Sequence, residues 1–286
     1  MPVRVIPRLD IKGPNLVKGV HMEGLRVLGK PEQFARYYYE SGADELLYMD
    51  VVASLYGRNS LLDLIERTAR EVFIPLTVGG GIRSVDHIRR VLRAGADKVA
   101  INTEAVRRPE FISEAARVFG SSTIVVSIEA IQQPDGRYLA YTDCGREWTG
   151  LDAVAWAVQA AELGAGELLV SSVDRDGTGK GFDVELTRQI AQRVSVPVIA
   201  SGGAGQLEHV REVVERGSAD AVGLASLLHY DFVRSAATHG AASAPTAQEG
   251  NLEFVRRQTA WSAIHSRPLA EVKRWLWNSG VDCRLN

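Results

Sequence analysis

Two carboxylates give this sequence of 286 residues its strongest signal of chemistry. Asp10 ends an apolar run that begins at Val3, and Glu129 ends a similar run that begins at Thr123. Such a pair can act as acid and base on one substrate when their surroundings hold them in different protonation states. The alternative is that one or both only accept hydrogen bonds from loop amides. We treat Asp10 and Glu129 as candidate catalytic residues.

Glycine-rich segments indicate which ligand these carboxylates would meet. Gly79-Gly80-Gly81 and Gly202-Gly203 each follow an apolar run, and glycine lets the backbone approach a ligand closely. Asn102-Thr103 and Ala225-Ser226 stand where a following helix would present free amide groups to an anion. Each half of the chain therefore contains a predicted phosphate cradle. Two cradles indicate a substrate that is phosphorylated at both ends.

The sequence repeats itself at long range, which is the first clue to the elements that position these residues. Similar blocks return in the same order in the second half of the chain, at almost constant spacing. The repeated blocks are 42–47 with 164–169, 74–81 with 196–203, and 96–103 with 219–226.

Short apolar runs alternate with amphipathic stretches such as 60–72 and 85–94. This alternation predicts an α/β fold in which helices cover a parallel sheet. Four runs in each half favour a (β/α)8 barrel, the TIM barrel, with a twofold half-barrel repeat; a doubly wound open sheet is the alternative. The carboxyl ends of the strands would then bring both carboxylates to opposite sides of one mouth. The predicted strands are 3–10, 45–51, 75–78, 98–101, 123–129, 167–172, 198–201 and 221–223.

We expect a single barrel domain over 1–286 with two excursions. The Asp-Gly pair within 133–138 predicts a β-hairpin after strand five. The second excursion is an insertion at 238–268, after strand eight, with an Ala/Ser/Pro-rich start and a candidate amphipathic helix at 254–264. It could cap the mouth, bind another protein or be a surface excursion only.

Composition limits the other possibilities. The chain has 33 basic and 35 acidic side chains, a net charge of −2, which argues against nucleic acid as its main partner. No apolar run approaches the ~20 residues of a membrane helix, and the first residues do not resemble a signal peptide, so we expect a cytoplasmic protein without membrane contact. Its two cysteines and six histidines lack the spacing of metal ligands, so neither metal nor cofactor is implied.

Five motifs in order, VGGGI, ADKVAINT, SVDRDGTGKGFD, VIASGGAG and GVDCRL, closely resemble the cyclase subunit of imidazole glycerol phosphate synthase of histidine biosynthesis. The resemblance covers nearly the whole chain except about 238–268. It implies a lyase that takes ammonia from a glutaminase partner and acts on phosphoribulosyl-formimino-aminoimidazole carboxamide ribotide, a bisphosphorylated substrate. The products are imidazole glycerol phosphate and an aminoimidazole carboxamide ribotide.

The resemblance also assigns residues at the barrel mouth. Asp10 matches the first of the family's two catalytic aspartates, and Glu129 stands at the position of the second. Lys18 and Asp50 match residues that line the active site. Positions that bind phosphate in the family match Gly81, Asn102, Thr103, Asp176, Gly177, Gly203, Ala225 and Ser226.

A second group belongs to the amino-terminal ends of the strands. Arg4, Glu45, Lys98 and Glu167 match the ring of four charges through which ammonia enters the family's barrel; a salt-bridged plug is the alternative. Asp97 matches a contact with the glutaminase, so we expect that partner on the amino-terminal face. The cysteines of this chain do not stand in a nucleophile motif, so it would need the partner to release ammonia.

The glutamate at position 129 departs from the family pattern. Its extra methylene moves the carboxylate, and a shift of ~1 Å can cost about a hundredfold in rate. Together with the insertion, this leaves a second possibility: a paralogue that delivers ammonia for amidation of another substrate, such as a surface-polysaccharide sugar. An isomerase of the same pathway and a non-catalytic scaffold are further alternatives.

Overall fold

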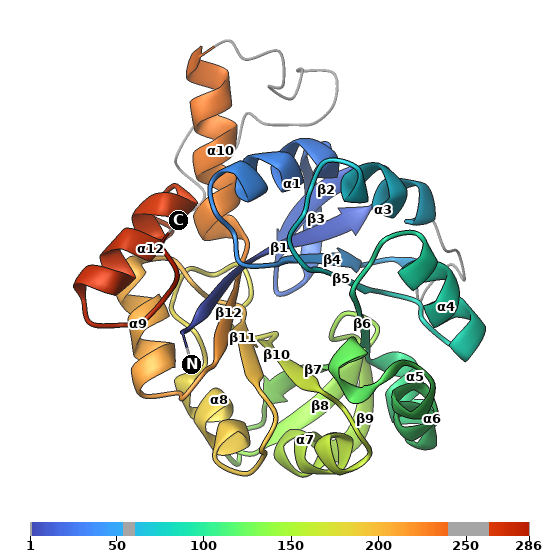
Figure 1. Ribbon diagram of the computed structural model, residues 1–286. Coiled ribbons are helices and arrows are strands. Elements are labelled where there is room, and N and C mark those ends of the chain that lie inside the picture. Colours follow the sequence, from blue (N-terminus) through green and yellow to red (C-terminus); the bar gives the residue numbers. More distant parts are fainter. Residues whose placement is uncertain (1, 54–60, 240–262, 286) are drawn as a thin grey trace.

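The computed structural model describes residues 2–53, 61–239 and 263–285, and eight of its parallel strands close into a barrel (Figure 1). The last barrel strand pairs with the first, and the fifth pairs with the sixth, so the circle is complete. The predicted (β/α)8 fold is confirmed, and the open-sheet alternative is wrong. The barrel strands are β1 (Arg4–Lys12), β4 (Leu46–Asp50), β5 (Leu76–Gly79), β6 (Lys98–Ile101), β7 (Ile124–Gln132), β10 (Glu167–Ser172), β11 (Val198–Ser201) and β12 (Ala221–Leu224).

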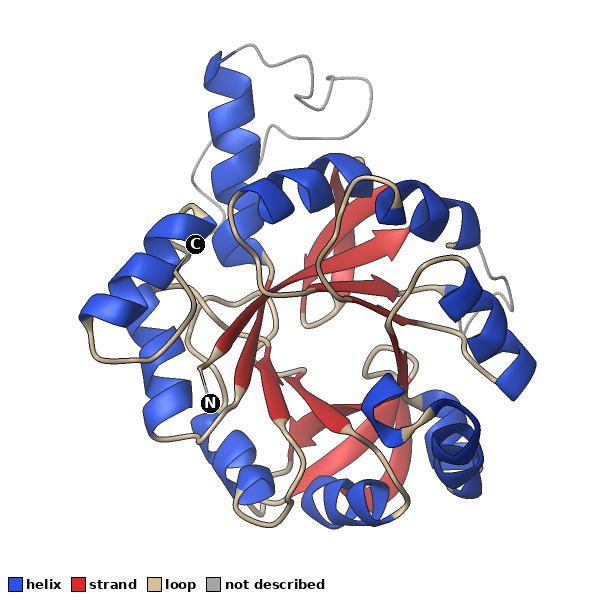
Figure 2. Ribbon diagram, viewed as in Figure 1, coloured by secondary structure: helices blue, strands red, loops and turns tan. Residues whose placement is uncertain are grey.

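Helices surround the barrel on its outside (Figure 2). The amphipathic stretches predicted at 60–72 and 85–94 contain α3 and α4, and Ser84 caps α4 by accepting a hydrogen bond from the amide of His87. Among the described residues, no helix has the length and apolar character of a membrane span. The helices are α1 (Pro31–Glu40), α3 (Leu62–Ala69), α4 (Val85–Arg93), α5 (Thr103–Arg107), α6 (Glu110–Phe119), α7 (Ala153–Glu162), α8 (Val184–Ala191), α9 (Leu207–Glu215), α10 (Ser226–His239) and α12 (Leu269–Asn278).

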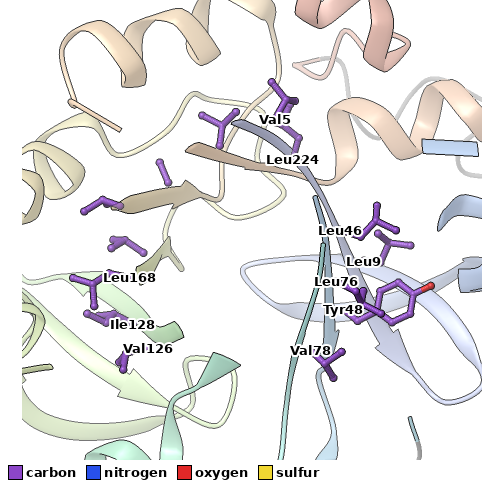
Figure 3. Close-up of a cluster of buried hydrophobic side chains, with 14 of the residues drawn as sticks. Val5, Leu9, Leu46, Tyr48, Leu76, Val78, Val126, Ile128, Leu168 and Leu224 are labelled. Atoms are coloured by element: carbon purple, nitrogen blue, oxygen red, sulfur yellow. The ribbon is translucent and has the colours of Figure 1, made fainter. Parts of the chain in front are cut away.

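The apolar core has two parts because the barrel strands are buried on both faces. The larger part includes Leu9, Tyr48 and Val126 together with residues of the helices; Figure 3 shows a portion of it. A smaller cluster joins residues of different strands within the barrel. This interior cluster consists of Ile6, Leu47, Met49, Ala100, Val125, Leu169, Ile199 and Ala221. Burial on both faces explains why the strands appear in the sequence as continuous apolar runs.

Two antiparallel extensions, each of two strands, continue the barrel strands β1 and β7. The hairpin predicted after strand five is confirmed: β8 (Tyr138–Thr142) pairs with β7, β9 (Glu147–Asp152) pairs with β8, and the amide of Gln133 donates to the Arg137 carbonyl at 2.7 Å. A matching hairpin after strand one, β2 (Asn15–Val20) with β3 (Glu23–Gly29), was not predicted. Its turn places His21 and Met22 at φ of 53° and 59°, a conformation that usually selects Asn-Gly. The sequence therefore lacked the usual turn signal.

The predicted insertion at 238–268 begins and ends within the described residues. Its first residues lie in α10, and 240–262, which contain most of the candidate helix at 254–264, fall outside the described residues. On its return, the buried Ile264 lies against Gly179, and the amide of His265 donates to the Gly205 carbonyl at 2.8 Å. The end of the insertion therefore contacts loops that follow β10 and β11.

Candidate active site

The predicted substrate-binding residues line two pockets at the carboxyl ends of the barrel strands. The first, which we call the N-half pocket, has among its lining residues Asp50, Gly81, Asn102, Thr103 and Glu129. The second, the C-half pocket, has among its lining residues Lys18, Asp176, Gly177, Gly203, Ala225 and Ser226. Every predicted substrate-binding residue lines one pocket or the other. One pocket in each half is the arrangement that a ligand with two phosphates would require.

Glycine is required in and near the pockets for two reasons, a positive φ and a close contact that leaves no room for a Cβ. Gly203 has a φ of 108°, and a Cβ there would collide with the carbonyl oxygen of Gly181. Gly81 also has a positive φ, of 66°, and lines the N-half pocket. Gly79 does not line that pocket; a Cβ there would lie 2.6 Å from the sulfur of Met49. The Gly-Gly-Gly motif therefore serves strand packing as well as the pocket.

Asp10 belongs to a buried network of alternating charges. Its Oδ1 accepts a hydrogen bond from Arg8 Nε at 2.9 Å, and its Oδ2 accepts one from Lys18 Nζ at 3.3 Å. The same ammonium group donates to Asp176 at 2.8 and 3.0 Å. Burial alone would raise the pKa of Asp10, but Arg8 and Lys18 outweigh it and lower the pKa. Asp10 is therefore a carboxylate at neutral pH, the form required of a base.

Glu129 lies on β7 in a different environment. Its Oε2 accepts a hydrogen bond from the amide of Gly145 at 2.9 Å, so the loop-amide contact considered as the alternative to a catalytic role is present at this residue. Burial raises the pKa of Glu129 from 4.5 to about 7, although the Gly145 amide and Arg8 oppose the rise. Near neutral pH this carboxyl can hold or release a proton. The two surroundings drive the pKa values of Asp10 and Glu129 apart, as acid–base chemistry needs.

The sequence analysis missed Arg8. It is buried, lines both pockets, and its Nη1 donates to the hydroxyls of Ser171 at 2.8 Å and Ser201 at 3.1 Å. A signal was present: Arg8 interrupts the apolar run of the first strand two residues before Asp10. Side chains two apart on a strand face the same way, so Arg8 had to share the side of Asp10.

At the other end of the barrel, the four predicted charges form a closed cycle. Arg4 Nη1 binds Glu45 Oε1 at 2.6 Å and Glu167 Oε1 at 3.0 Å; Lys98 Nζ binds Glu45 Oε2 at 3.1 Å and Glu167 Oε1 at 3.0 Å. Burial would lower the pKa of Arg4, but Glu167 and Glu45 outweigh it and raise the pKa. Glu167 Oε2 is buried without a hydrogen-bond partner in the described part of the chain. We call these four residues the charged ring.

Comparison with known proteins adds to this geometry. A family model described as histidine biosynthesis protein matches residues 4–234. Over 206 residues the chain is 61% identical to imidazole glycerol phosphate synthase subunit HisF of Legionella pneumophila, covering 72% of this chain and 97% of that relative. Over 232 residues it is 54% identical to the same subunit of Thermosynechococcus vestitus, covering 79% of this chain and 83% of that relative. The chain belongs to the histidine biosynthesis protein family.

Membership of the histidine biosynthesis protein family, with HisF proteins as relatives, confirms the resemblance that five motifs predicted. The matched residues include both carboxylates, the charged ring and the residues that define the two pockets. The match stops within α10, shortly before the predicted insertion at 238–268. Glu129 therefore lies inside the stretch that the family model matches, and the predicted insertion lies outside it.

Proposed function

We propose that the chain is the cyclase subunit of imidazole glycerol phosphate synthase. It would convert phosphoribulosyl-formimino-aminoimidazole carboxamide ribotide and ammonia into imidazole glycerol phosphate, aminoimidazole carboxamide ribotide and one water, which carries away the carbonyl oxygen that the ammonia nitrogen replaces. One observation carries the proposal: in the described part of the chain, two pockets lie at the barrel mouth, one per half. Glu129 lines the first of them, and Asp10 is hydrogen-bonded to Arg8, which lines both. A long ligand with a phosphate at each end fits this division.

In the proposed complex, each phosphate occupies one pocket. The cations that line the C-half pocket are Arg8 and Lys18, and both are already bound to carboxylates. The phosphate there would therefore be held mainly by backbone amides near Gly203 and by Ser226. Ser226 is buried and lines this pocket, so its hydroxyl would lie within reach of the phosphate.

Asp10 and Glu129 would share the proton transfers. Closing the imidazole ring requires removal of protons from the nitrogen that ammonia contributes, and cleavage of the substrate requires protonation of a leaving nitrogen. Asp10, held as a carboxylate by Arg8 and Lys18, suits the base. Glu129, with a pKa of about 7, suits the acid.

Ammonia would arrive from a glutaminase subunit at the amino-terminal face. Between the charged ring and the mouth lies the interior apolar cluster, which includes the small side chains of Ala100 and Ala221. An apolar interior favours a neutral molecule such as ammonia over an ammonium ion. Asp97 is exposed beside the ring, and its Oδ2 also accepts the amide of Leu76 at 2.8 Å, so this predicted partner contact has a structural role too.

The direct test supplies the purified chain with the bisphosphorylated substrate and an ammonium salt. We expect aminoimidazole carboxamide ribotide to form, and we expect the gene to complement a histidine auxotroph that lacks this subunit. A soluble, well-expressed chain that fails both tests would contradict the proposal. Failure would favour the amidation paralogue, an interpretation that the 61% identity to a HisF protein does not favour.

A further inference from the structure

Arg8 is the only residue of the described chain that lines both pockets. Its guanidinium has two bound nitrogens: Nε donates to Asp10, and Nη1 donates to Ser171 and Ser201. The third nitrogen, Nη2, makes no hydrogen bond with any residue in the described ranges, and it is not among the fully buried atoms without a partner. A donor between the two pockets is therefore left for a ligand.

The geometry fixes this donor in direction as well as in place. The guanidinium is planar, so three hydrogen bonds through Nε and Nη1 also set the plane in which Nη2 lies. Ser171 on β10 and Ser201 on β11 bind the guanidinium at Nη1, and Asp10 on β1 binds it at Nε. Because the side chain is buried, little freedom is left to lose when a ligand binds.

We propose that Arg8 binds the middle of the substrate. Nη2 donates a hydrogen bond to an oxygen or nitrogen acceptor that lies between the two phosphate ends, while Nε holds Asp10 beside the same atoms. Arg8 is thus both a substrate-binding residue and a positioning residue for Asp10. This inference rests on the proposed function, because it needs a ligand that spans both pockets.

Charge compensation alone is the competing explanation. Arg8 lies among acidic groups, with Asp10 in contact and Asp176 and Glu129 close enough to act on its charge. Arg8→Lys separates the two explanations because lysine keeps the positive charge but not the planar fork. If Arg8 binds substrate, KM in the ammonium-dependent reaction should rise about 10- to 100-fold, the loss expected for one hydrogen bond from a charged donor. Compensation alone predicts a KM close to that of the wild type.

Chemical rescue provides the second measurement. Arg8→Ala opens space at a site that both pockets reach, so guanidinium, at concentrations that leave the melting temperature unchanged, should restore part of kcat. The same addition should not raise the kcat of Asp10→Asn, and the exposed Arg36→Ala on α1 should need no rescue. If Arg8→Ala does not fold, the KM of Arg8→Lys alone distinguishes substrate binding from charge compensation.

The two proposals can fail separately. A wild-type chain that does not turn over the substrate with ammonium overturns the proposed function and, with it, the role of Arg8. A wild-type chain that is active while Arg8→Lys keeps both kcat and KM overturns the role of Arg8 alone. Absence of guanidinium rescue in a folded Arg8→Ala protein also overturns it.

Discussion

Arg8 and Asp10 project from the same strand, and Arg8 Nε donates to Asp10 Oδ1 over 2.9 Å. They are two residues apart, so the pleat of β1 turns both side chains to one face. This pair keeps Asp10 ionised, whereas burial raises the pKa of Glu129 to about 7. Around neutral pH the candidate catalytic pair therefore consists of one carboxylate, Asp10, and one carboxyl, Glu129, that still carries a proton part of the time.

Asp10→Asn should remove the base while keeping the shape of the side chain. We expect kcat with ammonium to fall about 10²- to 10⁴-fold, the usual contribution of a positioned acid or base. Asp63→Asn, on the exposed face of α3, is the matched control and should be fully active. Activity of Asp10→Asn within a few-fold of wild type would remove Asp10 from the mechanism.

The pH dependence of the reaction should identify the role of Glu129. If Glu129 is the acid, only its protonated form is active, so log kcat/KM should fall as the pH rises through about 7. Glu129→Gln should lower the rate and abolish this basic limb. A wild-type rate that instead increases through pH 7 and becomes flat above it would assign Glu129 as the base.

Stability should follow the same titration. The folded pKa of Glu129 lies above its ordinary value of 4.5, so folding favours the protonated form. The contribution of Glu129 to the free energy of unfolding is complete below about pH 4.5 and is lost as the pH rises through about 7. A shift of this size corresponds to about 3 kcal/mol as an upper bound. In urea unfolding, Glu129→Gln should remove this pH-dependent loss, and the exposed Glu66→Gln should retain it.

The sequence predicted what depends on periodicity and order. Eight apolar runs and the half-barrel repeat were enough for the barrel, and strand ends were enough to bring Asp10 and Glu129 to one mouth. The hairpin of β2 and β3 was missed because its turn uses His21 and Met22 in place of the usual turn residues. Arg8 was missed because a single charge in an apolar run does not reveal its hydrogen-bond partners. The pKa of Glu129 depends on burial by distant segments, which no local pattern contains.

The charged ring should matter only when ammonia comes from glutamine. Lys98 binds both Glu45 and Glu167, so Lys98→Met removes two of the four contacts that close the ring. With the glutaminase bound, we expect glutamine-dependent turnover to fall severalfold while ammonium-dependent turnover stays near the wild-type rate. Parallel assays with glutamine and with ammonium measure the ratio of the two turnover rates. Equal losses of turnover in both assays would make the charged ring a structural plug. The control is Lys30→Met, because Lys30 donates to Asn15 on β2 and does not belong to the ring.

A side chain at position 203 should destabilise the protein for two reasons, the backbone conformation of Gly203 and its close contact with Gly181. Its φ of 108° is strained for alanine, and a Cβ would also collide with the carbonyl oxygen of Gly181. Gly280 has a φ of 88° but no atom within 4 Å of the same position, so Gly280→Ala measures the backbone strain alone. We expect Gly280→Ala to cost about 1 kcal/mol of unfolding free energy and Gly203→Ala about 3 kcal/mol, because the collision adds to the strain. Urea unfolding checks both values. If the two variants lose the same stability, the collision is relieved by movement of the loop, and Gly203 is required for its conformation alone.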